Sequence, residues 1–116
     1  MLTVYGIPNC NTVKNARAWL QESGIEYAFH DFKKSGITED KLKQWFEAFG
    51  WEQVLNKKGL TWKKLSAEEQ AAVKDETSAA KMLMNNTSAI KRPVVEQNGK
   101  PVLIGFSEDS YTPVLR

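Results

Sequence analysis

The chain has 116 residues, of which 41% are hydrophobic and 26% are charged, as in an average soluble globular protein. This length is enough for a single domain with its own hydrophobic core. Sixteen basic and 14 acidic side chains leave a net charge of +2, so neither direct nucleic-acid binding nor an anionic membrane surface is expected.

The cysteine content and the N-terminus indicate a cellular compartment. Cys10 is the only cysteine, so the fold holds no internal disulfide. No apolar run approaches the roughly 18 residues of a membrane helix, and the N-terminus lacks the basic and apolar regions of a secretory signal. We therefore expect a cytoplasmic protein. One cysteine and one histidine cannot build a standard zinc site, and a Gly-rich phosphate loop is absent, so we expect no metal and no nucleotide.

The first third of the chain has the pattern of a strand, a helix and a second strand. Residues 2–6 are rich in strand formers, and a helical pattern begins at Asn11 and ends at Ser23-Gly24. Residues 26–32 alternate as a second strand, and His30 on this strand is interpreted as structural in preference to a general base. This order favours a parallel βαβ unit.

The middle of the chain is helical. Thr38 is placed to cap a helix that Gly50 ends, residues 66–69 read as a capping box, and residues 77–85 predict a further helix. Neither flank resembles a long linker. We therefore interpret residues 36–86, approximately, as a helical insert within one domain.

Strand patterns return near the C-terminus. Residues 94–97 and 101–104 are joined by Asn98-Gly99, a strong hairpin signal, and Pro113 restricts the tail to a short helical turn. The core is predicted to consist of residues 1–35 and 87–116. The fold class is α/β, with a four-stranded mixed sheet surrounded by helices.

Cys10 is the candidate nucleophile, because it lies where the first strand gives way to a helix. Free N–H groups and the dipole at a helix start favour the thiolate, and Lys14 at i+4 can add positive charge. Asn9 and Asn11 flank the thiol and can donate hydrogen bonds. The alternative is that Cys10 packs as a small hydrophobe, as free cysteines often do. Val13 stands where a second cysteine of a CxxC motif would be, so the chain supplies no resolving thiol.

Arg92-Pro93 opens the third strand. Proline is tolerated at the first residue of a strand. A cis X–Pro bond is a minority state, at about 5–6% in folded proteins, so the position alone does not establish one.

Four stretches, which span nearly the whole chain, together resemble a known family: YGIPNCNTVKNARAWL, NKKGLTWKKL, IKRPVV and LIGFSED. Their order and spacing are similar to those of the arsenate reductase (ArsC)/Spx family. Within this family the chain resembles the YffB group of small bacterial thiol reductases. The resemblance implies a thioredoxin-like fold with a helical insert between strands two and three.

The resemblance also implies roles for individual residues. Cys10 would be the nucleophile, Pro93 the cis-proline that faces it, and Arg92 the source of charge for an anionic group bound at the sulfur. The arsenate reductases use two further arginines. Their positions fall in the stretch 56–58, which holds an asparagine and two lysines, and at 105–106, which holds Gly and Phe. Lysine does not reproduce the bidentate guanidinium fork.

These features predict a thiol-disulfide oxidoreductase that uses Cys10 alone and takes glutathione as its co-substrate. Lys57 or Lys58 would help Arg92 to bind a carboxylate of glutathione or of a small thiol or disulfide substrate. The alternative is an Spx-like adaptor that binds a protein partner such as RNA polymerase through the aromatic and basic surface of the insert. Arsenate reduction ranks third, because two arginines are missing. A monomer is expected.

Overall fold

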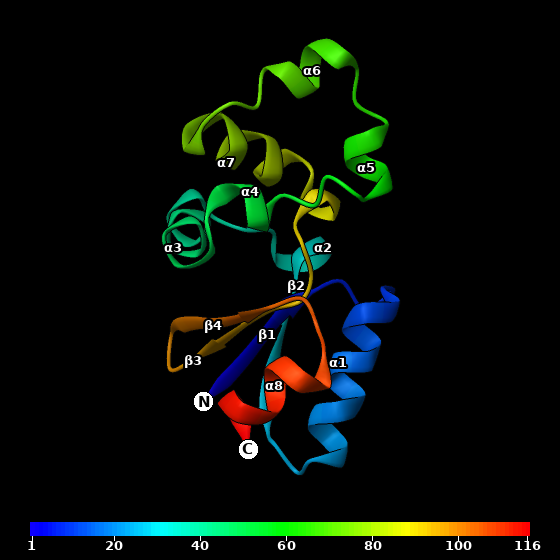
Figure 1. The fold of residues 1–116 in the computed structure, drawn as a ribbon, viewed down its shortest axis with the longest axis vertical. Coiled ribbons are helices and arrows are strands. Elements are labelled where there is room, and N and C mark those ends of the chain that lie inside the picture. The colour runs from blue at the N-terminus through cyan, green and yellow to red at the C-terminus, as the bar shows by residue number, and fades with distance from the viewer. The chain divides into compact units, whose positions relative to one another are not determined.

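The computed structural model describes all 116 residues, which divide into two compact units. Unit 1 comprises Met1–Ser35 and Arg92–Arg116, and unit 2 comprises Gly36–Lys91. Figure 1 labels the elements of both units. No helix combines the length and the apolar composition that crossing a membrane would require.

Unit 1 contains a four-stranded mixed sheet, which confirms the predicted α/β class. Its strands are β1 (Leu2–Gly6), β2 (Tyr27–Asp31), β3 (Val94–Gln97) and β4 (Lys100–Ile104), in the spatial order β2-β1-β3-β4. The β1–β2 pair is parallel, as the βαβ pattern predicts, and the other two pairs are antiparallel. Asn98 and Gly99 both have positive φ, which the predicted hairpin turn between β3 and β4 requires.

One face of this sheet carries the main core of unit 1. Helix α1 (Asn11–Glu22) buries Val13, Ala16, Trp19 and Leu20 at helical spacing. Trp19 meets the buried Tyr111 ring edge to face, with centroids 5.6 Å apart. The buried cluster comprises Leu2, Val4, Ala16, Trp19, Leu20, Val95, Leu103 and Tyr111.

The other face of the sheet is more polar. The Tyr5 hydroxyl donates to a carboxylate oxygen of the buried Glu96, at 3.0 Å. Burial, together with this neighbour, raises the pKa of Tyr5 to about 12. The Tyr5 ring centroid lies 4.8 Å from that of His30, which in turn packs edge-on to Phe32, the first residue of α2 (Phe32–Ser35). His30 therefore packs within a group of aromatic rings.

The C-terminal helix is longer than the sequence predicts. Helix α8 (Glu108–Leu115) extends two residues beyond Pro113, although proline removes one backbone donor and strains the helix. Two features offset this cost. The Ser107 hydroxyl accepts a hydrogen bond from Ser110 N–H, and Tyr111 is fully buried on the face that meets the sheet.

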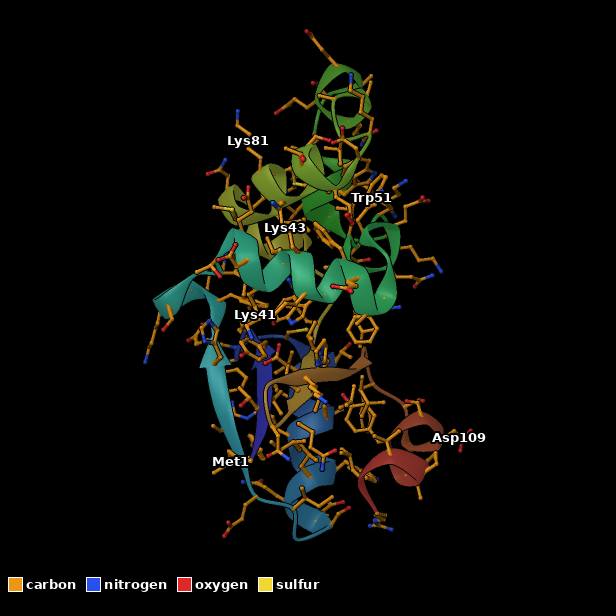
Figure 2. The ribbon with its side chains drawn as sticks, turned by 90° about the vertical axis from the view of Figure 1, so that its left-hand side faces the viewer. Met1, Lys41, Lys43, Trp51, Lys81 and Asp109 are labelled. Atoms are coloured by element: carbon orange, nitrogen blue, oxygen red, sulfur yellow. The ribbon has the colours of Figure 1, made fainter.

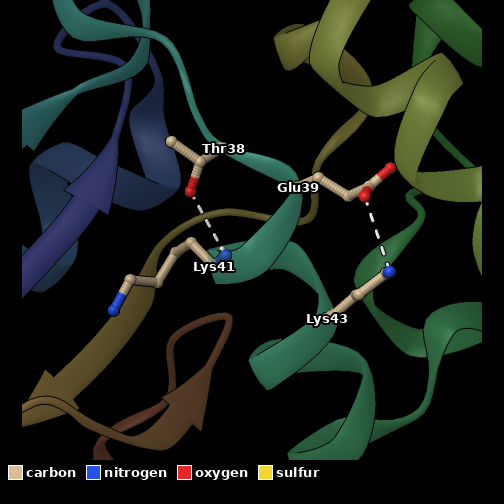
Figure 3. A network of polar contacts seen from close by, with 4 residues as sticks. All are labelled: Thr38, Glu39, Lys41 and Lys43. Atoms are coloured by element: carbon tan, nitrogen blue, oxygen red, sulfur yellow. Dashed lines mark hydrogen bonds and ion pairs between the residues drawn. The ribbon is translucent and has the colours of Figure 1, made fainter.

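Unit 2 consists of helices, as predicted. Thr38 caps α3 (Glu39–Phe49) by accepting from Lys41 N–H at 3.2 Å, and Glu39 pairs with Lys43 one turn later at 3.4 Å (Figure 3). The predicted Ser66–Glu69 capping box is present at the start of α6 (Ala67–Ala71). The remaining helices are α4 (Trp51–Val54), α5 (Leu60–Lys63), α7 (Glu76–Asn85) and the 3₁₀ turn η1 (Thr87–Ala89).

Helix α3 packs against α4 and α7 and buries Leu42, Trp45 and Phe46. Lys43 and Lys81 project from α3 and α7 into solvent (Figure 2). Residues 87–91 cluster with unit 2, because η1 contacts α5 and α7 and Ile90 forms a β-bridge with Leu55. The sequence pattern instead predicts that this short segment belongs to the core. It differs from the structure because the bridge joins residues far apart in the chain, which no local pattern reveals.

Gly6 permits the close approach of β1 to α1. A Cβ at this position would lie 2.8 Å from Cγ2 of Val13, which is fully buried. We expect Gly6→Ala to lower the free energy of unfolding by about 1–3 kcal/mol, because the added methyl overpacks this contact. The double variant Gly6→Ala, Val13→Ala should be more stable than the sum of the two single changes predicts. Denaturant unfolding of all four proteins tests this, and additive losses would show that the clash is relieved elsewhere.

Candidate functional site

The pairing of β1 with β3 brings two distant segments to the same end of the sheet. The strands are antiparallel, and Tyr5 near the end of β1 lies opposite Val94 at the start of β3. The chain that leaves β1 therefore emerges beside the chain that enters β3. Cys10 follows β1, and Arg92-Pro93 directly precedes β3. These three residues form the candidate site.

Cys10 occupies the N-cap position of α1. Its backbone is extended (φ −126°, ψ 125°), and its carbonyl accepts the first helical hydrogen bond, from Lys14 N–H at 2.9 Å. This conformation points the sulfur at the free N–H groups of the first helical turn. The backbone N–H groups of Val13 and Thr12 and the side chain of Arg92 are the groups that favour the thiolate, and the thiol is partly exposed.

Two opposing effects determine the acidity of this thiol. Burial raises the pKa of Cys10, whereas the Val13 N–H, the Arg92 guanidinium and the Thr12 N–H lower it. The second group prevails, so the pKa of Cys10 lies below its ordinary value. The thiolate is the nucleophilic form of cysteine, so this environment suits a reactive sulfur. It also favours an oxyanion or carboxylate bound beside the sulfur.

The Arg92-Pro93 bond is cis, as the family resemblance implies. Pro93 is buried, and its carbonyl accepts a hydrogen bond from Gly105 N–H at 2.8 Å. The Gly105 carbonyl accepts in turn from the buried Tyr111 hydroxyl, at 2.7 Å. The loop that carries Arg92 is thus tied through Gly105 to the core of unit 1.

The other predicted residues of unit 1 are placed differently. Asn9 and Asn11 are exposed, and the groups that lower the Cys10 pKa are instead the backbone N–H groups of Thr12 and Val13 and the side chain of Arg92. Lys14 is not among the groups that lower the Cys10 pKa; it lines a groove with Arg17 and Tyr27. Arg92, and not Lys14, is therefore the charged side chain that acts on the thiol.

Lys57 and Lys58 belong to unit 2. Together with Lys91 and Asn56 they line a pocket of about 330 Å³. Glu52 is the acidic residue of its lining. The Lys57 ammonium lies 5.8 Å from the ring centroids of both Trp51 and Trp62, within the range of a cation–π contact. This pocket can attract an anion.

Two contributions to the site cannot be predicted from the types of side chain in the sequence. The N–H groups of Thr12 and Val13 act through the backbone, so the helix start was their only signal in the sequence. Gly105 and Tyr111 hold the loop of Pro93 through hydrogen bonds that depend on the tertiary fold. No local pattern identifies them.

The chain is similar to several proteins over its whole length. A Haemophilus influenzae protein is 42% identical over 111 residues, which is 96% of each chain. The solved structure of a YffB protein is 40% identical, covers 100% of both chains and superposes with a TM-score of 0.93.

A regulator is also among the relatives. The global transcriptional regulator Spx of Staphylococcus aureus is 27% identical over 112 residues, which is 94% of this chain and 82% of Spx. The model of the ArsC family matches residues 5–114, from the first strand to the last helix. The chain, which has a thioredoxin-like sheet, a cysteine at the N-cap of its first helix and a cis-proline before β3, therefore belongs to the ArsC family.

Proposed function

We propose that the chain is a glutathione-dependent thiol-disulfide oxidoreductase with Cys10 as its nucleophile. One observation carries the proposal: a partly exposed thiol stands at the N-cap of α1, where two backbone N–H groups and an arginine lower its pKa. A cysteine that only packed would gain nothing from this arrangement.

The chemistry requires an external thiol, because the chain has no second cysteine. The Cys10 thiolate attacks the glutathionyl sulfur of a mixed disulfide, the S–S bond breaks, and the substrate thiolate leaves with the electron pair. The product is a Cys10–glutathione disulfide. A second glutathione thiolate attacks its glutathionyl sulfur, which releases oxidised glutathione and restores the Cys10 thiolate. Two electrons pass from glutathione to the substrate.

Arg92 has two roles in this scheme. It stabilises the attacking thiolate, and again the Cys10 thiolate that departs in the second step, through a charge-assisted hydrogen bond. Lys57 and Lys58 line the pocket of unit 2, which offers positive charge to an anion. A cytoplasmic location would supply this co-substrate in its reduced form.

Arsenate reduction ranks lower, because two arginines are missing, and the residues at one of their positions, 105–106, have other roles here. Gly105 is buried, has positive φ, and uses both its N–H and its carbonyl to hold the loop of Pro93. Phe106 packs edge-on to Tyr111, with ring centroids 4.9 Å apart. Neither residue can supply a guanidinium to an oxyanion.

A second function, that of a protein-binding adaptor, is favoured by the surface of unit 2. Leu60 on α5 is 73% exposed, and the Lys57 ammonium lies 5.8 Å from the ring centroids of both Trp51 and Trp62. An exposed apolar side chain beside aromatic and basic groups is typical of protein interfaces. The similarity to Spx makes RNA polymerase the partner to test.

The acidity of Cys10 is the first prediction of the oxidoreductase proposal. The rate of alkylation follows the thiolate fraction, so its midpoint should lie below pH 8.5, about the reference pKa of cysteine. Arg92→Gln removes a hydrogen bond and a charge that lower the pKa, so the midpoint should rise. Lys14→Gln should leave the midpoint unchanged, since Lys14 does not act on the thiol. A wild-type midpoint at or above the reference value would contradict the proposal.

Turnover provides the second prediction. With glutathione as reductant, the protein should reduce the cysteine–glutathione mixed disulfide, and incubation with oxidised glutathione should add one glutathione to Cys10. Cys10→Ser should abolish both results. Arg92→Gln should lower kcat/KM about ten- to a hundredfold, as expected when one hydrogen bond to a charged group is lost. Absence of the adduct at a reactive thiol would exclude glutathione as the resolving thiol.

The adaptor function makes a separate prediction. Purified RNA polymerase should bind Cys10→Ser as tightly as wild type, because this interface does not use the thiol. Leu60→Asp should weaken binding at least tenfold by placing a charge in the apolar part of the interface. Light scattering or surface plasmon resonance measures both. If wild type does not bind the purified polymerase, the adaptor reading with this partner is wrong.

A further inference from the structure

A groove runs along one side of unit 1, between α1 and β2. Two adjoining cavities, of about 710 and 210 Å³, share Arg17, Gln21 and Tyr27 among their lining residues. The larger cavity also reaches Phe29 and Glu26, and the smaller reaches Lys14. We refer to these two cavities as the α1–β2 groove. Figure 2 labels Met1, which lines the larger cavity beside the start of β1.

Arg17 is fixed inside this groove. Its guanidinium carbon lies 4.1 Å from the centroid of the Phe29 ring and 5.7 Å from that of Tyr27, and its Nε donates to the Tyr27 hydroxyl at 2.9 Å. An aromatic face and a phenol hold the guanidinium plane in place without neutralising its charge. The terminal N–H groups retain the geometry that binds a carboxylate through two parallel hydrogen bonds.

The groove begins one helical turn from Cys10. Lys14, Arg17 and Gln21 follow at spacings of three and four residues, so they share one face of α1, and Lys14 is bonded through its N–H to the Cys10 carbonyl. At 1.5 Å per residue, Gln21 lies about 16 Å along the helix from Cys10. An extended peptide of about five residues covers that length. Glutathione, a tripeptide, would fill only part of it.

The strand beside the groove can pair with an extended peptide. β2 is an edge strand of the sheet, so one side of its backbone has no strand neighbour. Such an edge can accept a further strand through main-chain hydrogen bonds, while side-chain pockets select the sequence.

Charge indicates which sequence fits. Lys14 and Arg17 are positive at the end of the groove nearer the start of α1, and Glu26 is the carboxylate of the larger cavity. We propose that the α1–β2 groove binds an extended, acidic segment of polypeptide adjacent to the oxidised cysteine of a protein substrate. This inference rests on the proposed function, because it names the substrate class of the same thiol. The protein thiolate is then the group that leaves when Cys10 takes the glutathionyl sulfur.

Two matched peptides test the specificity. Each is about six residues long, long enough to extend from Cys10 to Gln21, and carries a glutathionylated cysteine. In one peptide the cysteine is followed by glutamates and in the other by lysines. The wild-type kcat/KM should be at least tenfold higher for the acidic peptide, and the advantage should shrink as salt is added. Equal values for the two peptides would overturn the inference.

Variants locate the effect. Arg17→Gln should reduce the ratio of kcat/KM for the acidic peptide to that for the cysteine–glutathione disulfide about tenfold. Arg17→Lys keeps the charge but not the planar fork, so it should lose part of that ratio. Lys100→Gln, on the exposed start of β4, is the matched control and should retain it. Circular dichroism checks that the variants are folded, and an unchanged ratio in Arg17→Gln would contradict the inference.

Binding without turnover separates this inference from the proposed function. The reduced acidic peptide, titrated into Cys10→Ser, should shift NMR amide signals of α1 and β2, and Arg17→Gln should raise its Kd about tenfold. If the enzyme reduces the small disulfide but these signals do not shift, the groove proposal fails and the oxidoreductase proposal stands. If the signals shift but no disulfide is reduced, the groove binds acidic peptide and the oxidoreductase proposal fails.

Discussion

The antiparallel pairing of β1 with β3 is the constraint on which the site depends. It places the end of β1 opposite the start of β3, with Tyr5 paired with Val94. Cys10 and Arg92 meet only through this register. A shift of one residue would turn the buried side chains of β3 to the wrong face, so burial of Val95 in the core also fixes the register that serves the thiol.

The acidity of the thiol is the result of a balance that the fold holds in place. Burial opposes the thiolate, and two backbone donors and one guanidinium more than compensate. The backbone donors are available because Cys10 stands at the N-cap, and Gly6 leaves room for Val13 to approach the end of β1. The guanidinium is available because Gly105 links the loop of Pro93 to Tyr111. Substitutions distant from the sulfur can therefore change its reactivity.

Local patterns predicted most of the fold, and long-range contacts explain the rest. The helix that follows Cys10, the cap at Thr38, the box at Ser66 and the turn at Asn98-Gly99 are each determined by residues within one or two turns. The extent of α8 was not predicted, because burial of Tyr111 against the sheet outweighs the local effect of Pro113. The positive charge at the thiol likewise depends on a long-range contact and not on the local sequence. Lys14 is near Cys10 in sequence, but the sulfur is bound by Arg92, whose position only the sheet or a family resemblance could indicate.

The two arginines of unit 1 differ in what holds them. Arg92 hydrogen-bonds to the sulfur, so its charge is used within the site, whereas Arg17 is fixed by an aromatic ring and a phenol and keeps its charge for a ligand. In the proposed reaction the chain has no resolving thiol of its own, so the mixed disulfide at Cys10 must be open to an external thiol. Contacts that recognise a large substrate must then lie away from the sulfur. A groove that begins one helical turn from Cys10 and extends away along α1 satisfies both requirements.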